Sequence, residues 1–418
     1  MMKVISIIIY SIILILFNHN NPAYSQMIGG NTCIACHKEL GGKYVTPVKE
    51  WEKSVHKEAD ITCEKCHGGD PTSFEYTQNC SKNVHIPKPT EIPLFCGDCH
   101  SDANKMRQYN LRTDQLSQYR TSVHGRLLLD KGDTNVATCI SCHGSHNILA
   151  KNNPMSTVYR LNVPRTCAKC HANKELMAPY GISTDQYDEY INSSHGKLLL
   201  QKGEKRAPNC TDCHGIHGAA PPGIEEVSHV CGGCHAVTAA YYSKGPHYIA
   251  MKEVGIPRCI DCHNTHYILY PSNALFFGKE KRHCGSCHDI DSGAYKVGQE
   301  IVRYIEESAI EIEKAKNVMK SVQRTGIDLS LLENSISRAR THIVEVIPVT
   351  HTLSPVEVLN YTNLVKTETL EVERKANDIL KELERRKRVL KVALALILFI
   401  MILLFLKKRA LRKLTYNS

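Results

Sequence analysis

The chain is poor in aromatic side chains for its 418 residues. Phe, Trp and Tyr together supply 6% of the sequence, and Trp51 is the single tryptophan. Large aromatic side chains contribute much of the buried area of an ordinary domain, and the length is that of one or two domains. The composition therefore predicts an interior that is filled partly by something other than side chains.

Acidic residues are missing from the C-terminal end. Ten Lys and Arg residues lie from Arg385 to Lys413 with no Asp or Glu among them, and the rest of the chain holds 42 basic and 42 acidic residues. The formal charge of +10 is thus confined to the flanks of one segment. This placement argues against nucleic-acid binding, which needs a basic surface on the folded part.

The segment between these charges predicts a transmembrane helix. Val389 to Leu406 has 18 residues and one charged side chain, Lys391, near its edge. The length is sufficient to span a bilayer, and a lysine at that position extends toward the interface.

The N-terminus predicts a signal peptide over residues 1–25. Lys3 precedes an apolar run of 14 residues, and Ala23 and Ser25 are the small residues of a cleavage site. An uncleaved anchor is the alternative, although 14 residues are short for a span. Export also agrees with a chain rich in cysteine.

No cysteine follows Cys287, although the chain holds 19. Eighteen of them form nine copies of the motif C-x-x-C-H, and Cys80 stands outside it. The cysteine pairs are Cys33 and Cys36, Cys63 and Cys66, Cys96 and Cys99, Cys139 and Cys142, Cys167 and Cys170, Cys210 and Cys213, Cys231 and Cys234, Cys259 and Cys262, and Cys284 and Cys287. The motif histidines are His37, His67, His100, His143, His171, His214, His235, His263 and His288.

The motif suits covalent attachment of haem c. Two thiols add to the two vinyl groups of a haem, and the histidine that follows reaches the iron as the proximal ligand. A zinc site uses four ligands and needs no histidine after every cysteine pair, and a disulfide framework gives no reason for one. We therefore expect nine covalent haem c groups, with Cys80 as a free thiol or a crosslink partner.

A larger repeat groups the motifs in pairs. Residues 120–149 and 192–218 share the pattern S-x-H-G upstream of C-x-x-C-H-G-x-H, residues 245–269 are a shortened copy, and residues 51–69 are a degenerate one. One further motif follows each copy. The sequence therefore predicts four modules of two haems each, behind a lone haem site at Cys33.

Each iron needs a second axial ligand, and histidines outside the motifs are numerous enough to supply it. Four precede the modules and are expected to fold back over a haem: His56, His124, His195 and His247. Three follow a motif histidine by three residues, on the same side as their own haem, and are expected to bind a neighbouring one: His146, His217 and His266. His85 takes the place of this third kind in the first module.

The ninth ligand is expected to be His351, bound to the lone first haem. It lies in a turn before the last long helix. His229 and His283 nearly abut their own motifs, and His342 is the other histidine of the C-terminal region. An ordinary structural role for His351 is the alternative.

Beyond His288 the apolar residues recur at helical spacing. We predict helices that end at Gly326 and Pro348, and a third that begins at Pro355 behind the capping sequence S-P-V-E. The third continues without a break to Leu406, about 78 Å at 1.5 Å per residue. Its heptad seam consists of Val358, Val365, Val372 and Ile379.

These features predict a mainly α protein packed around haem with little β structure, whose long C-terminal helices run into one transmembrane helix. The expected regions are a signal peptide (1–25), a nonahaem cytochrome c domain (26–292), a helical coiled-coil-like region (293–388), a transmembrane helix (389–406) and a cytoplasmic tail (407–418). Because haem is attached after export, the haem domain is expected on the periplasmic or equivalent exported side.

The motifs and their extensions resemble the multihaem c-type cytochromes, a superfamily that includes pentahaem nitrite reductase, octahaem hydroxylamine oxidoreductase and tetrahaem quinol dehydrogenases. CHGGDP from Cys66 to Pro71 and CGDCH from Cys96 to His100 are similar to the opening haem sites of such proteins. Two features differ. All nine motifs end in histidine, where nitrite reductases often carry lysine at the catalytic haem, and the expected anchor is C-terminal, whereas the quinol dehydrogenases have an N-terminal one.

The expected function is electron transfer between a membrane complex and an exported redox partner. No histidine follows His351, so the predicted span offers no ligand for a b-type haem. An integral-membrane, cytochrome b-like, quinol-oxidising partner is therefore expected, together with a soluble exported redox protein. The alternatives are an oxidoreductase acting on a small nitrogen or sulfur compound at one open haem, the first being the suspect, and a scaffold that forms a homo-oligomer through the C-terminal helices.

Overall fold

The computed structural model describes residues 30–73, 83–223, 229–277, 283–323 and 326–416. These residues are mainly helical, with 68% of them in helices. In these ranges the β structure consists of one isolated bridge between Gly68 and Val84. The predicted signal peptide and Cys80 lie outside the described residues.

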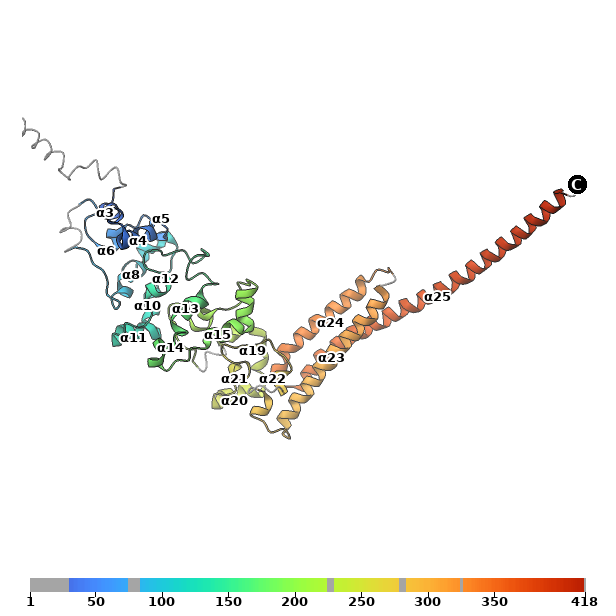
Figure 1. Ribbon diagram of the computed structural model, residues 1–418. Helices are drawn as coiled ribbons and strands as arrows, with labels where there is room; N and C mark the ends of the chain where they lie inside the picture. Colours follow the sequence, from blue (N-terminus) through green and yellow to red (C-terminus); the bar gives the residue numbers. More distant parts are fainter. Residues whose placement is uncertain (1–29, 74–82, 224–228, 278–282, 324–325, 417–418) are drawn as a thin grey trace, which may run out of the picture. The chain divides into compact units, whose positions relative to one another are not determined.

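Two compact units make up the chain. The first runs to residue 226 and includes 265–270, and the second holds 227–264 and the rest from 271. Short helices dominate the first unit, and long ones end the second (Figure 1). The predicted boundary at residue 293 coincides with the start of the first long helix, whereas the division into compact units falls earlier, inside the third module.

Helices of three to ten residues form the first unit. Gly41 and Gly132 end two of them. In chain order these helices are α3 (Thr32–Leu40), α4 (Gly42–Trp51), α5 (Val55–Glu58), α6 (Cys63–His67), α8 (Ile92–His100), α9 (Ala103–Met106), η1 (Arg107–Tyr109), α10 (Gln115–Thr121), α11 (Val123–Lys131), α12 (Cys139–His143), α13 (Val163–His171), α14 (Lys174–Met177), η2 (Ala178–Tyr180), α15 (Gln186–Asn192), α16 (Ser194–Gly196), η3 (Lys197–Gln201) and α17 (Cys210–His214).

The second unit begins with similar short helices and ends in three long ones. In chain order these are α19 (Ala236–Tyr242), α20 (Pro246–Val254), α21 (Cys259–His263), α22 (Ala274–Phe277), η4 (Cys284–Ser286), α23 (Gly293–Gln323), α24 (Ser330–Val349), η5 (Thr350–Thr352) and α25 (Pro355–Tyr416).

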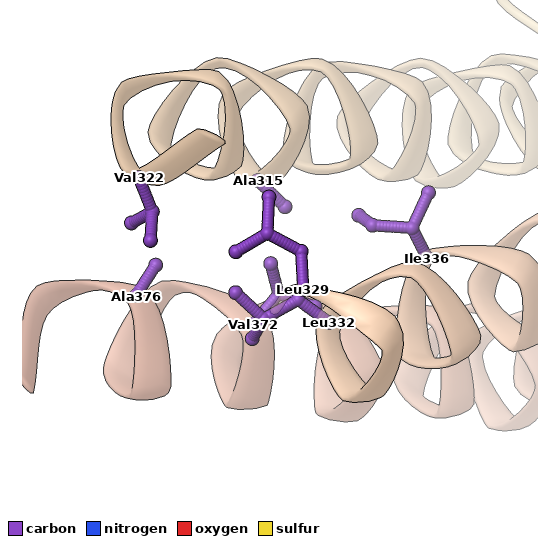
Figure 2. Packing of buried hydrophobic residues seen from close by; sticks show 7 residues of the cluster. All are labelled: Ala315, Val322, Leu329, Leu332, Ile336, Val372 and Ala376. Carbon is purple, nitrogen blue, oxygen red and sulfur yellow. The ribbon is translucent and has the colours of Figure 1, made fainter. Parts of the chain in front are cut away.

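The long helices α23, α24 and the first part of α25 pack against one another. Figure 2 shows one layer of this packing, in which Ala315 and Val322 of α23 meet Val372 and Ala376 of α25. The heptad residues Val358, Val365 and Val372 are fully buried there. The predicted seam is thus covered within one chain, and a homo-oligomer would have to use other faces of these helices.

The ends of these helices follow the local sequence. A single glycine, Gly326, adopts φ +74° after α23, as expected of a residue that ends a helix. Pro348 lies inside the last turn of α24, which ends one residue later than predicted. α25 begins at Pro355, with the Ser354 hydroxyl accepting from the backbone N–H of Glu357 at 3.3 Å.

The three clusters of buried hydrophobic residues found in the described ranges all belong to this helical part. Among residues 30–223, buried hydrophobic side chains such as Val48, Leu128 and Leu199 are scattered singly. A folded domain ordinarily has one contiguous apolar core. No such cluster is found in residues 30–223 within the described ranges.

α25 continues beyond the bundle as a helix long and apolar enough to span a membrane. The stretch from Pro355 to Arg409 contains a window with a mean hydropathy of 3.1, and none of that window is buried inside the protein. The apolar side chains from Val389 to Leu406 are about half exposed. They require an apolar environment that the chain itself does not supply.

Candidate functional site

Most of the motifs form one turn of helix. In α12, α17 and α21 the turn begins at the first cysteine and ends at the histidine, and a polar residue before it caps the turn. The residue after the histidine has φ of +70° to +84° in these three, at Gly144, Gly215 and Asn264. Glycine adopts this conformation without strain, which explains the glycine in C-H-G-x-H.

No disulfide joins the eighteen motif cysteines to one another. The first cysteine of each motif is half-buried, and the second is exposed in every motif except the one at Cys167. Eight of the nine cysteine pairs thus have one cysteine at the surface, accessible for covalent attachment.

Seven motif histidines each face one histidine from outside the motifs. Their ring centres are 5.9 to 6.3 Å apart. The pairs are His100 with His56 (6.2 Å), His67 with His146 (6.1 Å), His171 with His124 (6.1 Å), His143 with His217 (6.3 Å), His214 with His266 (5.9 Å), His288 with His247 (6.0 Å) and His263 with His351 (6.0 Å).

This separation fits two imidazoles bound to opposite sides of one metal ion. A metal–nitrogen bond of about 2.0–2.1 Å, added to about 1.1 Å from the nitrogen to the ring centre, puts the two centres about 6.3 Å apart. Rings in van der Waals stacking would lie closer together. The same spacing in seven places indicates a common ligand geometry.

The pairs follow the repeat. A histidine that precedes a module faces the second motif of that module, as His56 faces His100. A histidine three residues after a motif faces the first motif of the preceding module, as His146 faces His67. Each module is therefore joined to the next through one histidine pair.

Backbone hydrogen bonds reinforce the same register. The N–H of Val55 donates to the carbonyl of Ile148 at 2.9 Å, and the N–H of Val123 donates to Ala219 at 3.1 Å. The donors immediately precede the paired histidines His56 and His124. The acceptors lie two residues after the paired histidines His146 and His217. The spacing between successive modules is thus fixed by the main chain as well as by the rings.

The second ring nitrogen of several paired histidines is already engaged. Nδ1 of His351 lies 3.1 Å from the carbonyl of Pro348, and Nδ1 of His67 lies 2.9 Å from that of His85. Nδ1 of His266 lies 3.7 Å from the Glu189 carboxylate. A partner at Nδ1 fixes the ring orientation and leaves Nε2 for a metal.

Burial favours the neutral form of several paired rings. Burial lowers the pKa of His263 to about 4, and the nearby His351 adds a smaller effect in the same direction. Burial likewise lowers the pKa of His124 and of His143. Neutral imidazole is the form that binds metals.

Cysteines of successive motifs lie close together. Cys96 and Cys139 are within hydrogen-bonding range, and so are Cys167 and Cys210. Groups attached at these sulfurs would be neighbours in the order of the motifs along the chain.

The structure corrects the assignment of His351 to the lone first site. Its ring centre lies 6.0 Å from that of His263 in the fourth module, because the turn η5 between α24 and α25 packs beside α19. His37 of the first site instead has Tyr44 as its ring neighbour at 6.2 Å, and its Nδ1 lies 3.2 Å from the Tyr44 carbonyl.

The remaining histidines are placed as follows. His85 is exposed, with Nε2 3.3 Å from the Glu91 carboxylate, and in the described ranges it faces Phe95 rather than a motif histidine. His195 lies in α16, and its role as a ligand stays a prediction, as does that of His85. His283 caps η4 by accepting from Gly285, and His342 contacts Glu345.

The sequence analysis did not identify one set of aromatic residues that recurs in all four modules. An aromatic residue stands five positions before each upstream histidine, and its N–H or O–H donates to the carbonyl two residues before the first cysteine of the module. The bonds join Trp51 to Ile61 (2.8 Å), Tyr119 to Ala137 (2.8 Å), Tyr190 to Pro208 (2.8 Å) and Tyr242 to Pro257 (2.6 Å). The constant offset was the signal that would have identified them.

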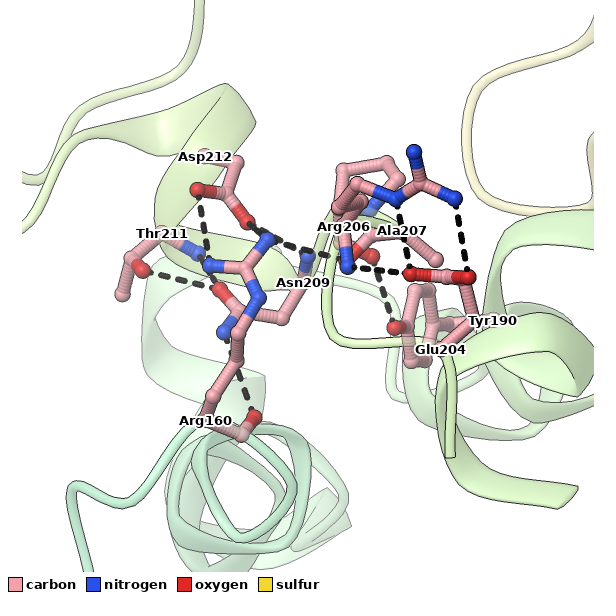
Figure 3. Close-up of polar contacts among 9 residues, drawn as sticks. Arg160, Tyr190, Glu204, Arg206, Ala207, Asn209, Thr211 and Asp212 are labelled. Carbon is pink, nitrogen blue, oxygen red and sulfur yellow. Dashed lines mark hydrogen bonds and ion pairs between the residues drawn. The ribbon is translucent and has the colours of Figure 1, made fainter. Parts of the chain in front are cut away.

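Figure 3 shows this bond in the third module. Tyr190 reaches the stretch that leads into α17, which Arg160 holds from the other side through the Ala207 carbonyl at 2.9 Å and the Asp212 carboxylate at 2.8 Å. The chain entering the motif is thus fixed from two directions.

Within the described ranges no group of three or more His, Cys, Asp or Glu side chains could hold a metal ion. A metal at a histidine pair would therefore need its other ligands from a non-protein group. No family model matches the chain, and neither a curated protein nor a solved structure matches it.

Proposed function

We propose that the protein is a membrane-anchored, nine-haem c-type cytochrome that transfers electrons. The observation that carries this proposal is the set of seven histidine pairs, each with one ring from a C-x-x-C-H motif and ring centres about 6 Å apart. Each motif would supply two thiols for covalent attachment of a haem, and each histidine pair would hold its iron.

The residues present fit haem. The motif cysteines are not joined in disulfides, burial lowers the pKa of His263 to about 4, and residues 30–223 have only scattered apolar side chains to fill their interior. When bound, haem supplies an iron that alternates between ferric and ferrous states. The chain's own residues attach it, orient its axial ligands through Nδ1 contacts and hold successive sites in contact.

Electron transfer follows from two axial histidines per iron. An iron with both axial positions filled has no place for a substrate, and close sites in series serve to pass electrons along. We propose an integral-membrane, cytochrome b-like partner that oxidises quinol and a soluble exported partner. The single apolar helix supports the membrane location, and the haem domain is proposed to lie on the exported side.

A pyridine haemochrome assay combined with intact mass of the exported protein tests the proposal. About nine haem c groups per chain are expected, with all or nearly all of the iron low-spin. A protein that carries no covalent haem after maturation in a strain competent for haem attachment would overturn it.

The first site favours a second candidate function. His37 faces Tyr44 where the seven paired motif histidines face a histidine. An iron there would have an exchangeable position for a small nitrogen or sulfur compound. High-spin iron of about one haem per chain that binds cyanide or nitrite would support this oxidoreductase reading. If all of the iron is low-spin and does not bind cyanide, electron transfer remains as the one proposed function.

A further inference from the structure

We propose that the helical bundle leading into the membrane supplies, through His351, the second axial ligand of the haem at Cys259 and Cys262. This inference rests on the proposed function. The bundle would then be part of the redox chain as well as a tether, because its fold would determine the coordination of one iron.

The first step is the order of the ligands. The first motifs of the first three modules face a histidine from the following module, namely His146, His217 and His266. No fifth module follows the fourth. His351 occupies the corresponding position on His263, at 6.0 Å and with an angle of 21° between the rings. The bundle thus takes the place of the missing module.

The second step is how firmly His351 is held. Its Nδ1 contacts the Pro348 carbonyl at 3.1 Å, and the adjacent Thr352 hydroxyl donates to the Val349 carbonyl at 2.8 Å. Val349 is fully buried. Leu353 then takes a left-handed conformation with φ +52°, which turns the chain into α25. These contacts fix the orientation of the His351 ring beside His263 and leave Nε2 for a metal.

The third step is the contact with the haem-bearing segment. A Cβ on Gly245 would lie 2.7 Å from the His351 carbonyl, so the backbones are in close contact. Gly245 stands two residues before His247, which faces His288 of the next motif. The Tyr241 and Tyr361 hydroxyls are hydrogen-bonded at 2.8 Å, and this bond ties α19 to α25. A displacement of the bundle would therefore move ligands of two haems.

His351→Ala tests the inference, with His342→Ala as the matched control. Both histidines belong to the same helical hairpin, but His342 contacts Glu345 rather than a motif histidine. In His351→Ala we expect about one additional high-spin haem per chain, carbon monoxide binding at the same stoichiometry and return to low spin on adding imidazole. His342→Ala should match the parent protein.

His351→Met provides a variant that retains a ligand. Methionine opposite histidine raises the reduction potential of a haem, so this variant should stay low-spin with one potential shifted upward. Unchanged spin state in His351→Ala or an unchanged set of potentials in His351→Met would overturn the inference. Haem content, measured on the same samples, separates that result from failure of the proposed function, which would remove the haem altogether.

A second observation carries an independent inference. We infer that Trp51, Tyr119, Tyr190 and Tyr242 are positioning residues that fix the spacing of the two haems within each module. Each sits on the helix or turn that leads to an upstream histidine, and each bonds to the chain entering the first motif. In three modules that histidine faces the second motif. The hydrogen bond of the aromatic residue therefore links the first and the second haem site of the module.

The local structure supports such a role. Ser122 donates to the Tyr119 carbonyl at 2.6 Å and accepts from the N–H of Gly125 at 2.9 Å. The tyrosine and His124 are thereby held in one rigid turn. Tyr119 is also buried, and burial raises its pKa to about 12, with Cys139 adding to the effect. The hydroxyl therefore remains a donor over the whole working range of pH.

Tyr119→Phe removes this donor, and Tyr180→Phe is the control because it also removes one hydroxyl bond, that to Asp133 at 2.7 Å. We expect Tyr119→Phe to change the Soret circular dichroism that arises from coupling between neighbouring haems, at unchanged haem content and spin state. Tyr180→Phe should not change it. A residue with a purely structural role would lower the melting temperature and leave this signal alone.

The first module supplies a rescue test. Its donor is the indole N–H of Trp51, which shows that the position accepts different aromatic donors. Trp51→Tyr should keep the coupled signal, whereas Trp51→Phe should lose part of it. Equal spectra for these two variants, or for Tyr119→Phe and the parent protein, would overturn the positioning role.

Discussion

At the scale of single residues, the S-x-H-G pattern has a steric explanation. The serine caps the turn that carries the histidine, and the glycine follows because the chain folds tightly over the preceding helix. A Cβ on Gly125 would lie 1.9 Å from the Tyr119 carbonyl oxygen, and one on Gly196 would lie 2.0 Å from that of Tyr190. Since the obstacle is backbone, no side-chain movement relieves it.

Gly125→Ala should therefore destabilise the first unit by about 1–3 kcal/mol, the usual cost of overpacking a closed site. The thermal midpoint followed by far-UV circular dichroism should fall. Gly293→Ala is the control, because a Cβ there meets nothing within 4 Å. If the two variants melt at the same temperature, the turn is more adaptable than the close contact implies.

Residue-level reasoning from the sequence identified the motifs and the set of candidate ligands but misjudged one assignment. His351 was expected on the first haem, because a count of ligands does not show which neighbour each one reaches. The aromatic donors were missed for a different reason. Their partners are backbone carbonyls, which carry no sequence signal, so only the constant spacing of the aromatic residue was visible.

At the scale of helices, sequence periodicity and capping were sufficient to predict where α25 begins and which of its faces is buried. The heptad of α25 predicted a buried seam, and Val358, Val365 and Val372 are fully buried. The capping sequence predicted the start at Pro355, where α25 begins. The partner of the seam was not predictable, because a heptad repeat does not distinguish helices of the same chain from those of a second copy.

Val365→Ala tests the bundle packing. The side chain is fully buried among Ile312 and Ala339, and removing two methyl groups should cost about 2 kcal/mol from lost burial and the remaining cavity. Val356→Ala on the same helix is the control, because Val356 is 68% exposed. Equal melting temperatures for the two variants would contradict the intramolecular seam.

The bundle should also depend on pH through one ion pair. Arg338 donates to both oxygens of Glu368 at 2.9 and 2.8 Å, and this lowers the pKa of Glu368 below its ordinary value of 4.5. A carboxyl whose pKa is lowered by folding contributes stability above pH 4.5 and loses it as the pH falls.

Arg338→Gln should therefore melt below the parent protein at pH 7, and the two should converge as the pH drops below 4.5. The difference at pH 7 should be small, because the pair is partly exposed and screened by solvent. Thermal melts across this pH range measure the effect. If the difference in melting temperature between the two proteins does not change with pH, Arg338 stabilises the bundle by packing and not by its charge.

At the scale of the whole molecule, the chain contains two kinds of interior. The C-terminal bundle is held by an ordinary apolar core, whereas the first unit has scattered buried side chains and five of the seven histidine pairs. Under the proposed function, haem would supply the missing core. Folding of that unit would then depend on haem attachment, as for small domains that require a metal.

A chain that ends at residue 388 tests the role of the last segment. The segment it lacks contains the exposed apolar stretch from Val389 to Leu406 and six of the ten basic residues that lie from Arg385 to Lys413. We expect the truncated protein to leave the membrane fraction with its haem content unchanged, because the bundle packing ends before residue 389. A truncated protein that still sediments with membranes would show that another surface holds it there.

The orientation of the chain can be tested with a tag after Ser418. Under the proposed function, haem attachment would place residues 30–292 on the exported side, and a single span would then leave Lys407 to Ser418 on the other. When protease is added on the exported side only, it should digest the motif-bearing part and leave the tag intact. The same tag on the chain ending at residue 388 should become accessible, because that chain has no span. A tag cleaved equally in both proteins would mean that α25 lies along the membrane surface instead of crossing it.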